Sequence, residues 1–256
     1  MPTTSITLDE TPLVLHLLRR ADDALILGHR LSEWTGHAPT LEEELALANM
    51  ALDLIGQARL LYAYAGSLAG HDEDQLAYLR DARAWRNCLL VELPNGDFAQ
   101  TILRIVLFSA FMDPCWQATT RSADPTLAAI AAKAEKEVAY HLRHSAEWLI
   151  RLGDGTEESH RRAEAALDAL WPYSGELFEA DAADQAMIDA GIAPDPATLR
   201  GTWDATLADV LARATLARPG DTWMQTGGRT GRHTEHLGYL LADLQYLQRA
   251  YPGATW

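Results

Sequence analysis

The chain has 256 residues, of which 48% are hydrophobic and 22% are charged, the balance of an ordinary globular protein. Its 36 acidic residues outnumber its 21 basic ones, which gives a net charge of −15. A field of that sign repels phosphate backbones and anionic lipids, and this argues against a nucleic acid or a membrane surface as a partner.

Export and membrane signals are also lacking. The first ten residues are polar and do not show the basic-then-apolar order of a secretory signal. The most apolar stretch, Thr101 to Met112, is interrupted by Arg104 and is too short to span a bilayer. The two cysteines, Cys88 and Cys115, are not clustered, so they indicate neither a disulfide framework nor a zinc site. We therefore expect a cytoplasmic protein.

Apolar residues recur at helical spacing along most of the chain, and Gly, Pro and capping residues divide it into segments. Thr40, Asp97 and Asp124 are placed to cap long helices, while Pro114 predicts a kink or break near Asp113. We predict helices over residues 12–34, 40–68, 75–91, 98–121, 125–152, 157–179, 198–216 and 234–250, with Pro172 interrupting the 157–179 segment. No repeat period is present, so these helices predict one all-α bundle spanning residues 1–256 rather than a solenoid.

The second and fourth long helices can be compared with a di-iron carboxylate bundle, in which two helices each supply Glu-x-x-His toward the interior. The inward positions here are Leu54 with Gln57 on one helix and Val138 with His141 on the other. Both carboxylate positions are aliphatic, and one imidazole is replaced by an amide. We therefore interpret Gln57 and His141 as hydrogen-bonded core residues rather than iron ligands.

Two other groups of residues suggest metal chemistry less strongly. Glu137, His141 and His144 lie close together on one helix and could supply three ligands, but their position favours a solvated or interface-facing rim. His233 and His236 flank Glu235 at the start of the last helix, where a glutamate is favoured by the helix dipole alone.

A glycine-rich loop, Gly227-Gly228-x-x-Gly231, precedes that last helix and carries Arg229 and Arg232. Such a loop could hold a phosphate at a helix N-terminus. It lacks the Lys-Ser/Thr ending of a P-loop, which favours an ordinary loop.

Several stretches of the chain resemble the non-catalytic, ferritin-like subunit of ring-1,2-phenylacetyl-CoA epoxidase. The resemblance extends over essentially the whole chain, and its most distinctive part is the C-terminal tail. The stretches that carry it are Glu33 to Pro39, Leu45 to Asn49, Leu54 to Arg59, Pro94 to Ala99, Lys136 to Arg143, Leu152 to Thr156, His233 to Gly238, Gln245 to Arg249 and Pro252 to Trp256.

This resemblance implies a ferritin-like bundle with additional C-terminal helices and a role in aerobic phenylacetate breakdown. In that complex a related catalytic subunit holds the di-iron centre, a small bridging subunit joins it, and a flavin and iron–sulfur reductase delivers electrons from NADPH. The chain is expected to pair with the catalytic subunit and to bind no cofactor itself. The Glu-x-x-His motifs of the catalytic subunit fall at Leu54–Gln57 and Val138–His141 here, and its lone carboxylates near Leu25 and Ser109.

Three functions are therefore open at the level of sequence. The first is a structural subunit without an active site, and the second is a di-iron oxygenase active in its own right. The third is a module that helps to hold the CoA moiety through Arg229 or Arg232.

Overall fold

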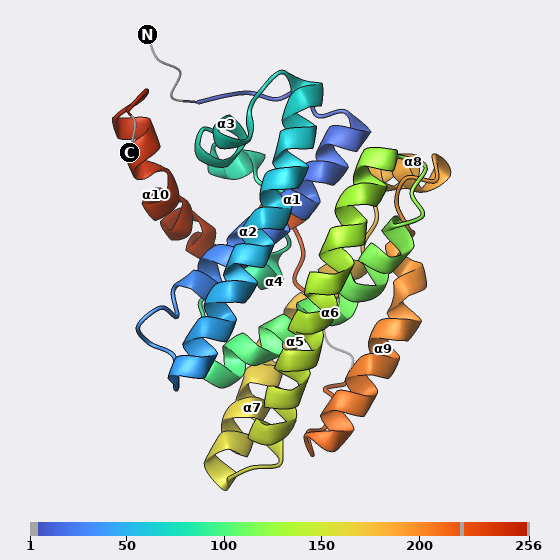
Figure 1. The fold of residues 1–256 in the computed structure, drawn as a ribbon. Helices are drawn as coiled ribbons and strands as arrows, with labels where there is room; N and C mark the ends of the chain where they lie inside the picture. The colour runs from blue at the N-terminus through green and yellow to red at the C-terminus, as the bar shows by residue number, and fades with distance from the viewer. Residues whose placement is uncertain (1–4, 221–222, 255–256) are drawn as a thin grey trace.

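Residues 5–220 and 223–254 are described by a computed structural model, and the regular structure in them is entirely helical. Four long helices form the body: α1 (Pro12–Ser32), α2 (Leu41–Ala69), α5 (Phe98–Thr119) and α6 (Pro125–Gly153). Helix α1 packs along α2 and α5 packs along α6, as Figure 1 shows. This arrangement confirms the predicted all-α, ferritin-like bundle.

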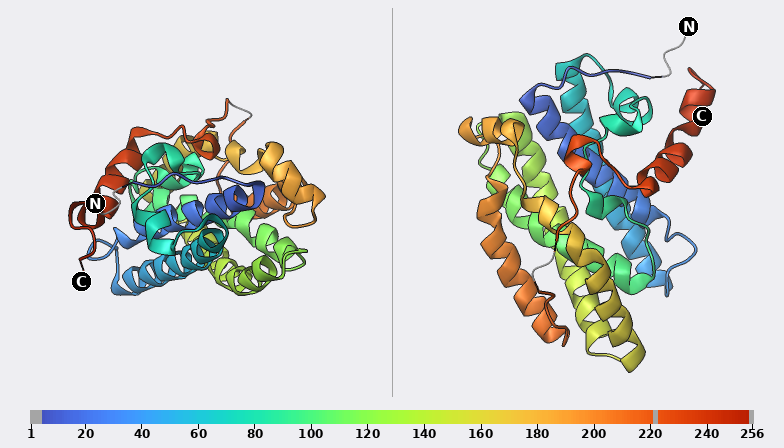
Figure 2. Two further views of the ribbon diagram at one scale, coloured as in Figure 1. Left: turned by 90° about the horizontal axis from the view of Figure 1, so that it is seen from above. Right: turned by 180° about the vertical axis from the view of Figure 1, so that it is seen from behind.

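Shorter helices surround this body. They are α3 (Glu73–Tyr78), α4 (Leu89–Glu92), α7 (Glu157–Leu170), α8 (Ala182–Asp189), α9 (Pro196–Arg213) and α10 (Glu235–Ala250). Helices α7 and α9 pack on α5, and α8 packs on α1. Helix α10 contacts α3 and lies at the edge of the molecule, with its first half near the C-terminal end of α1 (Figure 2). The predicted caps are confirmed, because Thr40, Asp97 and Asp124 each accept a hydrogen bond from the first turn of their helix.

Several elements can be compared with the prediction in detail. Residues 75–91 form two short helices, α3 and α4, rather than one helix, with a 3₁₀ turn and extended residues between them. Helix α7 ends at Leu170 and gives way to 3₁₀ turns, which confirms the predicted interruption at Pro172, a residue with no backbone N–H to donate. Helix α8 was not predicted; it is short, and a capping box between Asp181 and Asp184 begins it. Helix α5 continues through Pro114 to Thr119, so of the kink or break expected near Asp113 the break does not occur.

Helix α5 is the apolar centre of the fold. In the part of the chain that the structure describes, it is the one helix long and apolar enough to cross a membrane, and 78% of its most apolar window is buried inside the protein. Helices α6, α7 and α9 cover it. Burial of this kind is typical of the core helix of a bundle.

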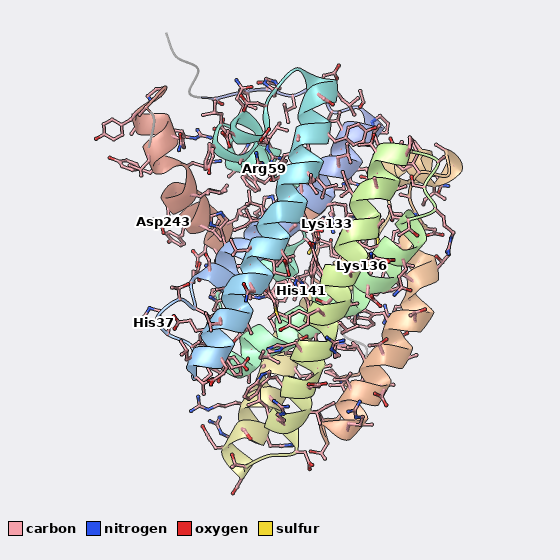
Figure 3. The ribbon with its side chains drawn as sticks, viewed as in Figure 1. His37, Arg59, Lys133, Lys136, His141 and Asp243 are labelled. Atoms are coloured by element: carbon pink, nitrogen blue, oxygen red, sulfur yellow. The ribbon has the colours of Figure 1, made fainter. Side chains whose placement is uncertain are left out.

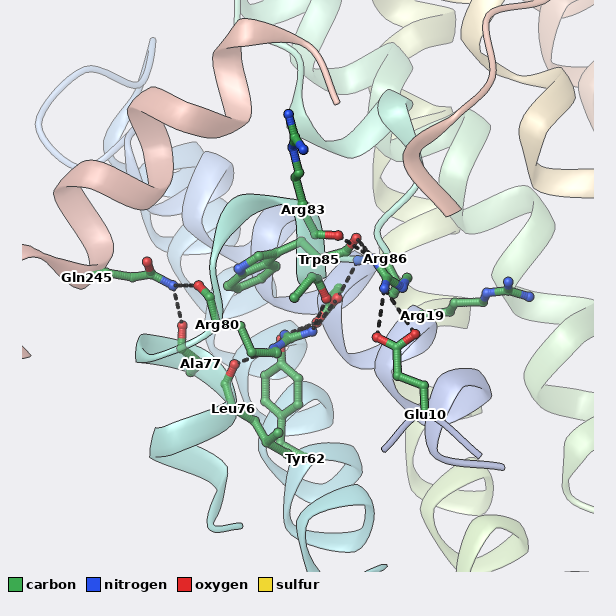
Figure 4. A network of polar contacts seen from close by, with 12 residues as sticks. Glu10, Arg19, Tyr62, Leu76, Ala77, Arg80, Arg83, Trp85, Arg86 and Gln245 are labelled. Atoms are coloured by element: carbon green, nitrogen blue, oxygen red, sulfur yellow. Dashed lines mark hydrogen bonds and ion pairs between the residues drawn. The ribbon is translucent and has the colours of Figure 1, made fainter. Parts of the chain in front are cut away.

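A buried ion pair joins α1 to the segment between α3 and α4. Arg80 and Asp22 both have fully buried side chains, and Arg80 Nη2 lies 2.5 Å from Asp22 Oδ1. The Tyr62 hydroxyl of α2 donates to the same oxygen at 2.5 Å, and the backbone N–H of Arg86 donates to Asp22 Oδ2 at 2.7 Å. Arg80 also lies over the Trp85 ring, 4.5 Å from its centroid (Figure 4). Asp22 thus binds a backbone N–H that a continuous helix over residues 75–91 would use internally.

Replacing Arg80 by Met is expected to lower the free energy of unfolding by about 3–5 kcal/mol, because it leaves the Asp22 carboxylate buried without its partner. Arg59→Met is the matched control, since the Arg59 side chain is 76% exposed and its 3.3 Å contact with Glu73 lies at the surface. We expect about 0.5 kcal/mol or less from that control. Urea denaturation followed by circular dichroism measures both changes. Equal losses from the two variants would show that the buried pair does not stabilise the fold.

Candidate functional site

The six positions that the resemblance compares with a di-iron ligand set are all buried. Their exposed fractions are 2% for Leu54, 3% for Gln57, 2% for Val138, 2% for His141, 7% for Leu25 and 3% for Ser109. They come from the four long helices α1, α2, α5 and α6. Leu25 lies beside Ile55 and Ala58 of α2, on the side of the α1–α2 pair that faces α3.

The side chains at these positions do not fit an iron pair. Leu54, Val138 and Leu25 are aliphatic and Ser109 is a neutral hydroxyl, so the carboxylates that would bridge two irons and balance their charge are missing. Within residues 5–220 and 223–254, no three His, Cys, Asp or Glu side chains converge into a group that could hold a metal ion.

Hydrogen bonds between side chains connect α2 to α6. Gln57 Nε2 donates to Glu137 Oε2 at 2.9 Å, and His141 Nε2 lies 3.1 Å from Asp53 Oδ2. The two helices run antiparallel, so two further contacts extend this series, one at each end. These are His144 Nε2 with Glu43 Oε2 at 3.0 Å, and the Tyr64 hydroxyl, which donates to Asp124 Oδ2 at 2.5 Å. We call these four contacts the α2–α6 ladder; Figure 3 labels His141 within it.

The ladder gives Glu137 and His144 partners on α2. Their side chains are 16% and 17% exposed, so they lie at a partly exposed edge between α2 and α6. They do not act with His141 as one ligand group, because each of the three has a different partner on α2.

The glycine-rich loop binds a carboxylate of this same chain. Glu176 is 1% exposed, and its Oε1 accepts from the N–H of Gly227 at 2.9 Å and from that of Arg229 at 3.2 Å. The Arg229 guanidinium lies 2.8 Å from Asp23 Oδ2 and donates to the carbonyls of Arg19 and Arg86. The N–H groups and the guanidinium that could have bound a phosphate or CoA are therefore engaged in folding contacts, whereas Arg232 is exposed.

His233 is likewise held by the fold. Its Nδ1 lies 2.7 Å from Glu92 Oε2 and its Nε2 lies 3.0 Å from the carbonyl oxygen of Trp85. Burial alone would lower the pKa of His233, but the hydrogen bond and the charge of Glu92 outweigh it and raise that pKa. This accounts for His233 without a metal.

The sequence analysis missed the acidic residues at the centre of these contacts, which are Asp22, Asp23, Glu92 and Glu176. One signal for them is present in the chain. The run Arg19-Arg20-Ala21-Asp22-Asp23 interrupts an otherwise apolar helix, and all five residues are buried. A charged run with no exposed side indicates that its partners must come from elsewhere in the fold.

Comparison with known proteins agrees with this geometry. The fold is an all-α bundle of the ferritin type, with the aliphatic side chains of Leu54 and Val138 buried inside it. The family model described as phenylacetic acid catabolic protein matches residues 1–256, and the chain belongs to that family. The chain is 51% identical over 245 residues to one of the subunits of 1,2-phenylacetyl-CoA epoxidase, the one designated C, of Escherichia coli strain K12. The match covers 95% of this chain and 99% of that protein.

His16 of α1 makes the stability of the fold depend on pH. Burial, followed by the neighbouring charges of Arg20, Arg19 and Arg229, lowers the pKa of His16 from 6.5 to about 3. The folded state therefore binds fewer protons than the unfolded state between those two values. The stability that neutral, buried His16 permits is fully present above pH 6.5 and is lost as the pH falls below that value.

We expect His16 to remove about 1.5 kcal/mol of stability between pH 6.5 and pH 5.0. The variant His16→Gln cannot titrate, so its free energy of unfolding will fall less steeply over that range. Urea denaturation at several pH values measures the slopes, and the variant at exposed His37, His37→Gln, is the control that keeps the wild-type slope. Parallel slopes for wild type and His16→Gln would contradict this account.

Proposed function

We propose that this chain is the non-catalytic structural subunit of a multicomponent phenylacetyl-CoA 1,2-epoxidase that acts in aerobic phenylacetate catabolism. The observation that carries the proposal is the pair of aliphatic residues, Leu54 and Val138, at the carboxylate positions of a buried di-iron framework. Gln57 and His141, which complete those motifs, are hydrogen-bonded to Glu137 and Asp53.

The partners follow from the same proposal. The chain pairs with the related catalytic subunit, which holds the di-iron centre, and a small bridging subunit and a reductase complete the complex. The reductase brings NADPH, flavin and an iron–sulfur cluster, while this chain contributes no cofactor. The relative from Escherichia coli, which is named as a subunit of the epoxidase, supports a cytoplasmic hetero-oligomer of this kind.

The role of the chain in this complex is mechanical. The α2–α6 ladder connects two helices that a metal pair connects in a di-iron protein, so the framework keeps its shape through hydrogen bonds. A rigid bundle can then support the helices of the catalytic subunit in the geometry that iron requires. Removing the chain is expected to abolish turnover although no iron ligand is lost.

The iron content of the purified chain tests this proposal directly. We expect no stoichiometric iron in the chain alone. We also expect no epoxidation from the complex assembled without it, with activity restored when the chain is added back. Two irons per chain together with an oxo-bridge absorption band would instead support the alternative, a di-iron oxygenase active in its own right.

Restoring the Glu-x-x-His motifs tests whether these residues alone would be enough to bind iron. The triple variant Leu54→Glu, Gln57→His and Val138→Glu is expected to bind iron weakly at best, because Leu25 and Ser109 leave the site short of carboxylates. The matched control carries Leu54→Gln, Gln57→His and Val138→Gln, which have similar shapes but no added charge. Metal analysis after dialysis compares the two, and tight binding of two irons by the triple variant would contradict this count of ligands.

A further inference from the structure

Helix α10 is packed against the rest of the molecule along one narrow side. Four of its sixteen residues are buried, namely Leu237, Leu240, Leu241 and Gln245. On its outer side, Tyr239 and Tyr246 are 68% and 63% exposed. Apolar burial therefore contributes little to holding this helix in place, and elements of this kind open most readily in a folded protein.

Open hollows border the buried side of α10. One has a volume of about 530 Å³ and is lined by Leu241 and by Asp81, which lies in the segment between α3 and α4. The other, of about 400 Å³, lies between Leu240 and His29 of α1. A leucine beside a hollow lacks packing partners on that side, so less dispersion energy is lost when the helix moves away. The attachment of α10 therefore depends on the polar contacts at its two ends.

The contact at the start of α10 is buried and charged, and we call it the α10 anchor. His233 Nδ1 lies 2.7 Å from Glu92 Oε2, and the two side chains are 6% and 0% exposed. The backbone N–H of Thr234, the N-cap residue of the helix, donates to Glu92 Oε1 at 2.6 Å. Hydrogen bonds to a buried carboxylate are strong, and breaking these would leave the Glu92 charge short of donors.

The contact near the end of α10 is weaker, and we call it the α10 latch. Gln245 Nε2 donates to the backbone carbonyls of Ala77 and Arg80, both at 3.0 Å (Figure 4). Arg249 Nη2 donates to the same Arg80 carbonyl at 2.8 Å, and its Nη1 lies 3.1 Å from Asp81 Oδ1. The carbonyls are neutral acceptors that water can serve once the helix has moved, and the Asp81 side chain is 69% exposed. The latch is therefore the end that releases first.

A glycine lies between the anchor and the latch. Gly238 belongs to the first turn of α10, and a Cβ added there would meet no atom within 4 Å. Packing therefore does not require a glycine at this position. Glycine inside a helix costs stability relative to alanine because of its greater backbone freedom, so the first turn of α10 is the place where the helix bends most easily.

We propose that α10 is an arm of the fold that opens as one unit about residues 234–238. Gln245 and Arg249 release the carbonyls of the α3–α4 segment, while the anchor and the four long helices remain in place. Opening makes those carbonyls and the buried leucines of α10 accessible. This conformational device does not depend on the proposed function.

Native-state hydrogen exchange of the full chain, followed by NMR at increasing urea concentrations, tests the proposal. We expect the amides of residues 240–248 to share one opening reaction, at least about 100-fold more frequent than that of the α5 amides and less dependent on urea. The Thr234 amide, which is bound to Glu92, is expected to keep the protection of the core.

Two glutamines of α10 provide a matched pair of variants. Gln245→Ala removes both hydrogen bonds of the latch glutamine and is expected to make the opening at least about tenfold more frequent, with α5 exchange unchanged. Gln248→Ala is the control, because it makes the same change in helix propensity and Gln248 has no side-chain hydrogen bond among the described residues. Arg249→Met, which keeps the aliphatic stem, is expected to act in the same direction as Gln245→Ala.

Three results would overturn the inference. Amides of α10 that exchange only through global unfolding, with the urea dependence of α5, would show that no separate opening exists. Protection that decreases residue by residue toward Ala250 would show fraying of the last turns instead of a unit. Equal exchange in Gln245→Ala and Gln248→Ala would show that the latch does not control the opening.

Discussion

Two adjacent carboxylates in α1, Asp22 and Asp23, hold the rest of the structure together. Both are fully buried, and each is bound by an arginine from another part of the chain, Asp22 by Arg80 and Asp23 by Arg229. Asp23 Oδ1 also accepts from the backbone N–H of Cys88 at 2.7 Å. Since an unpaired buried charge is costly, these contacts fix the α3–α4 segment and the C-terminal loop on α1.

Side-chain hydrogen bonds join the two halves of the bundle body. A metal pair in a di-iron protein stabilises its framework by binding charged ligands from several helices, whereas the α2–α6 ladder uses hydrogen bonds between polar side chains. Each of these side chains has a partner, so few polar groups remain unsatisfied there. Leu54 and Val138 add buried apolar side chains beside the ladder.

Long helices and their caps could be predicted from the sequence because the information is local. Thr40, Asp97 and Asp124 each act on the turn that follows them, and the apolar stripes of the long helices extend over many turns. The burial of Leu54, Gln57, Val138 and His141 was predictable for the same reason, since each pair lies within one helical turn on the apolar side of its helix.

The break between α3 and α4 could not be predicted in this way. It depends on Asp22, which is 64 residues away from the Arg86 N–H that it binds. The binding of Glu176 by the glycine-rich loop could not be predicted for the same reason, because Glu176 is 51 residues from Gly227. Both features are set by burial of a distant carboxylate, and helical periodicity carries no information about that.

The contact between Asp23 and Arg229 has a consequence for the order in which the protein is made. The two residues are 206 positions apart, so α1 leaves the ribosome long before its partner arginine has been translated. Until then a deeply buried helix of the bundle holds a carboxylate without its counter-ion, and closing the core around it is unfavourable. Folding of the N-terminal helices is thereby linked to the completion of the C-terminal loop, and a nascent chain that stops before Arg229 lacks the means to stabilise its own core.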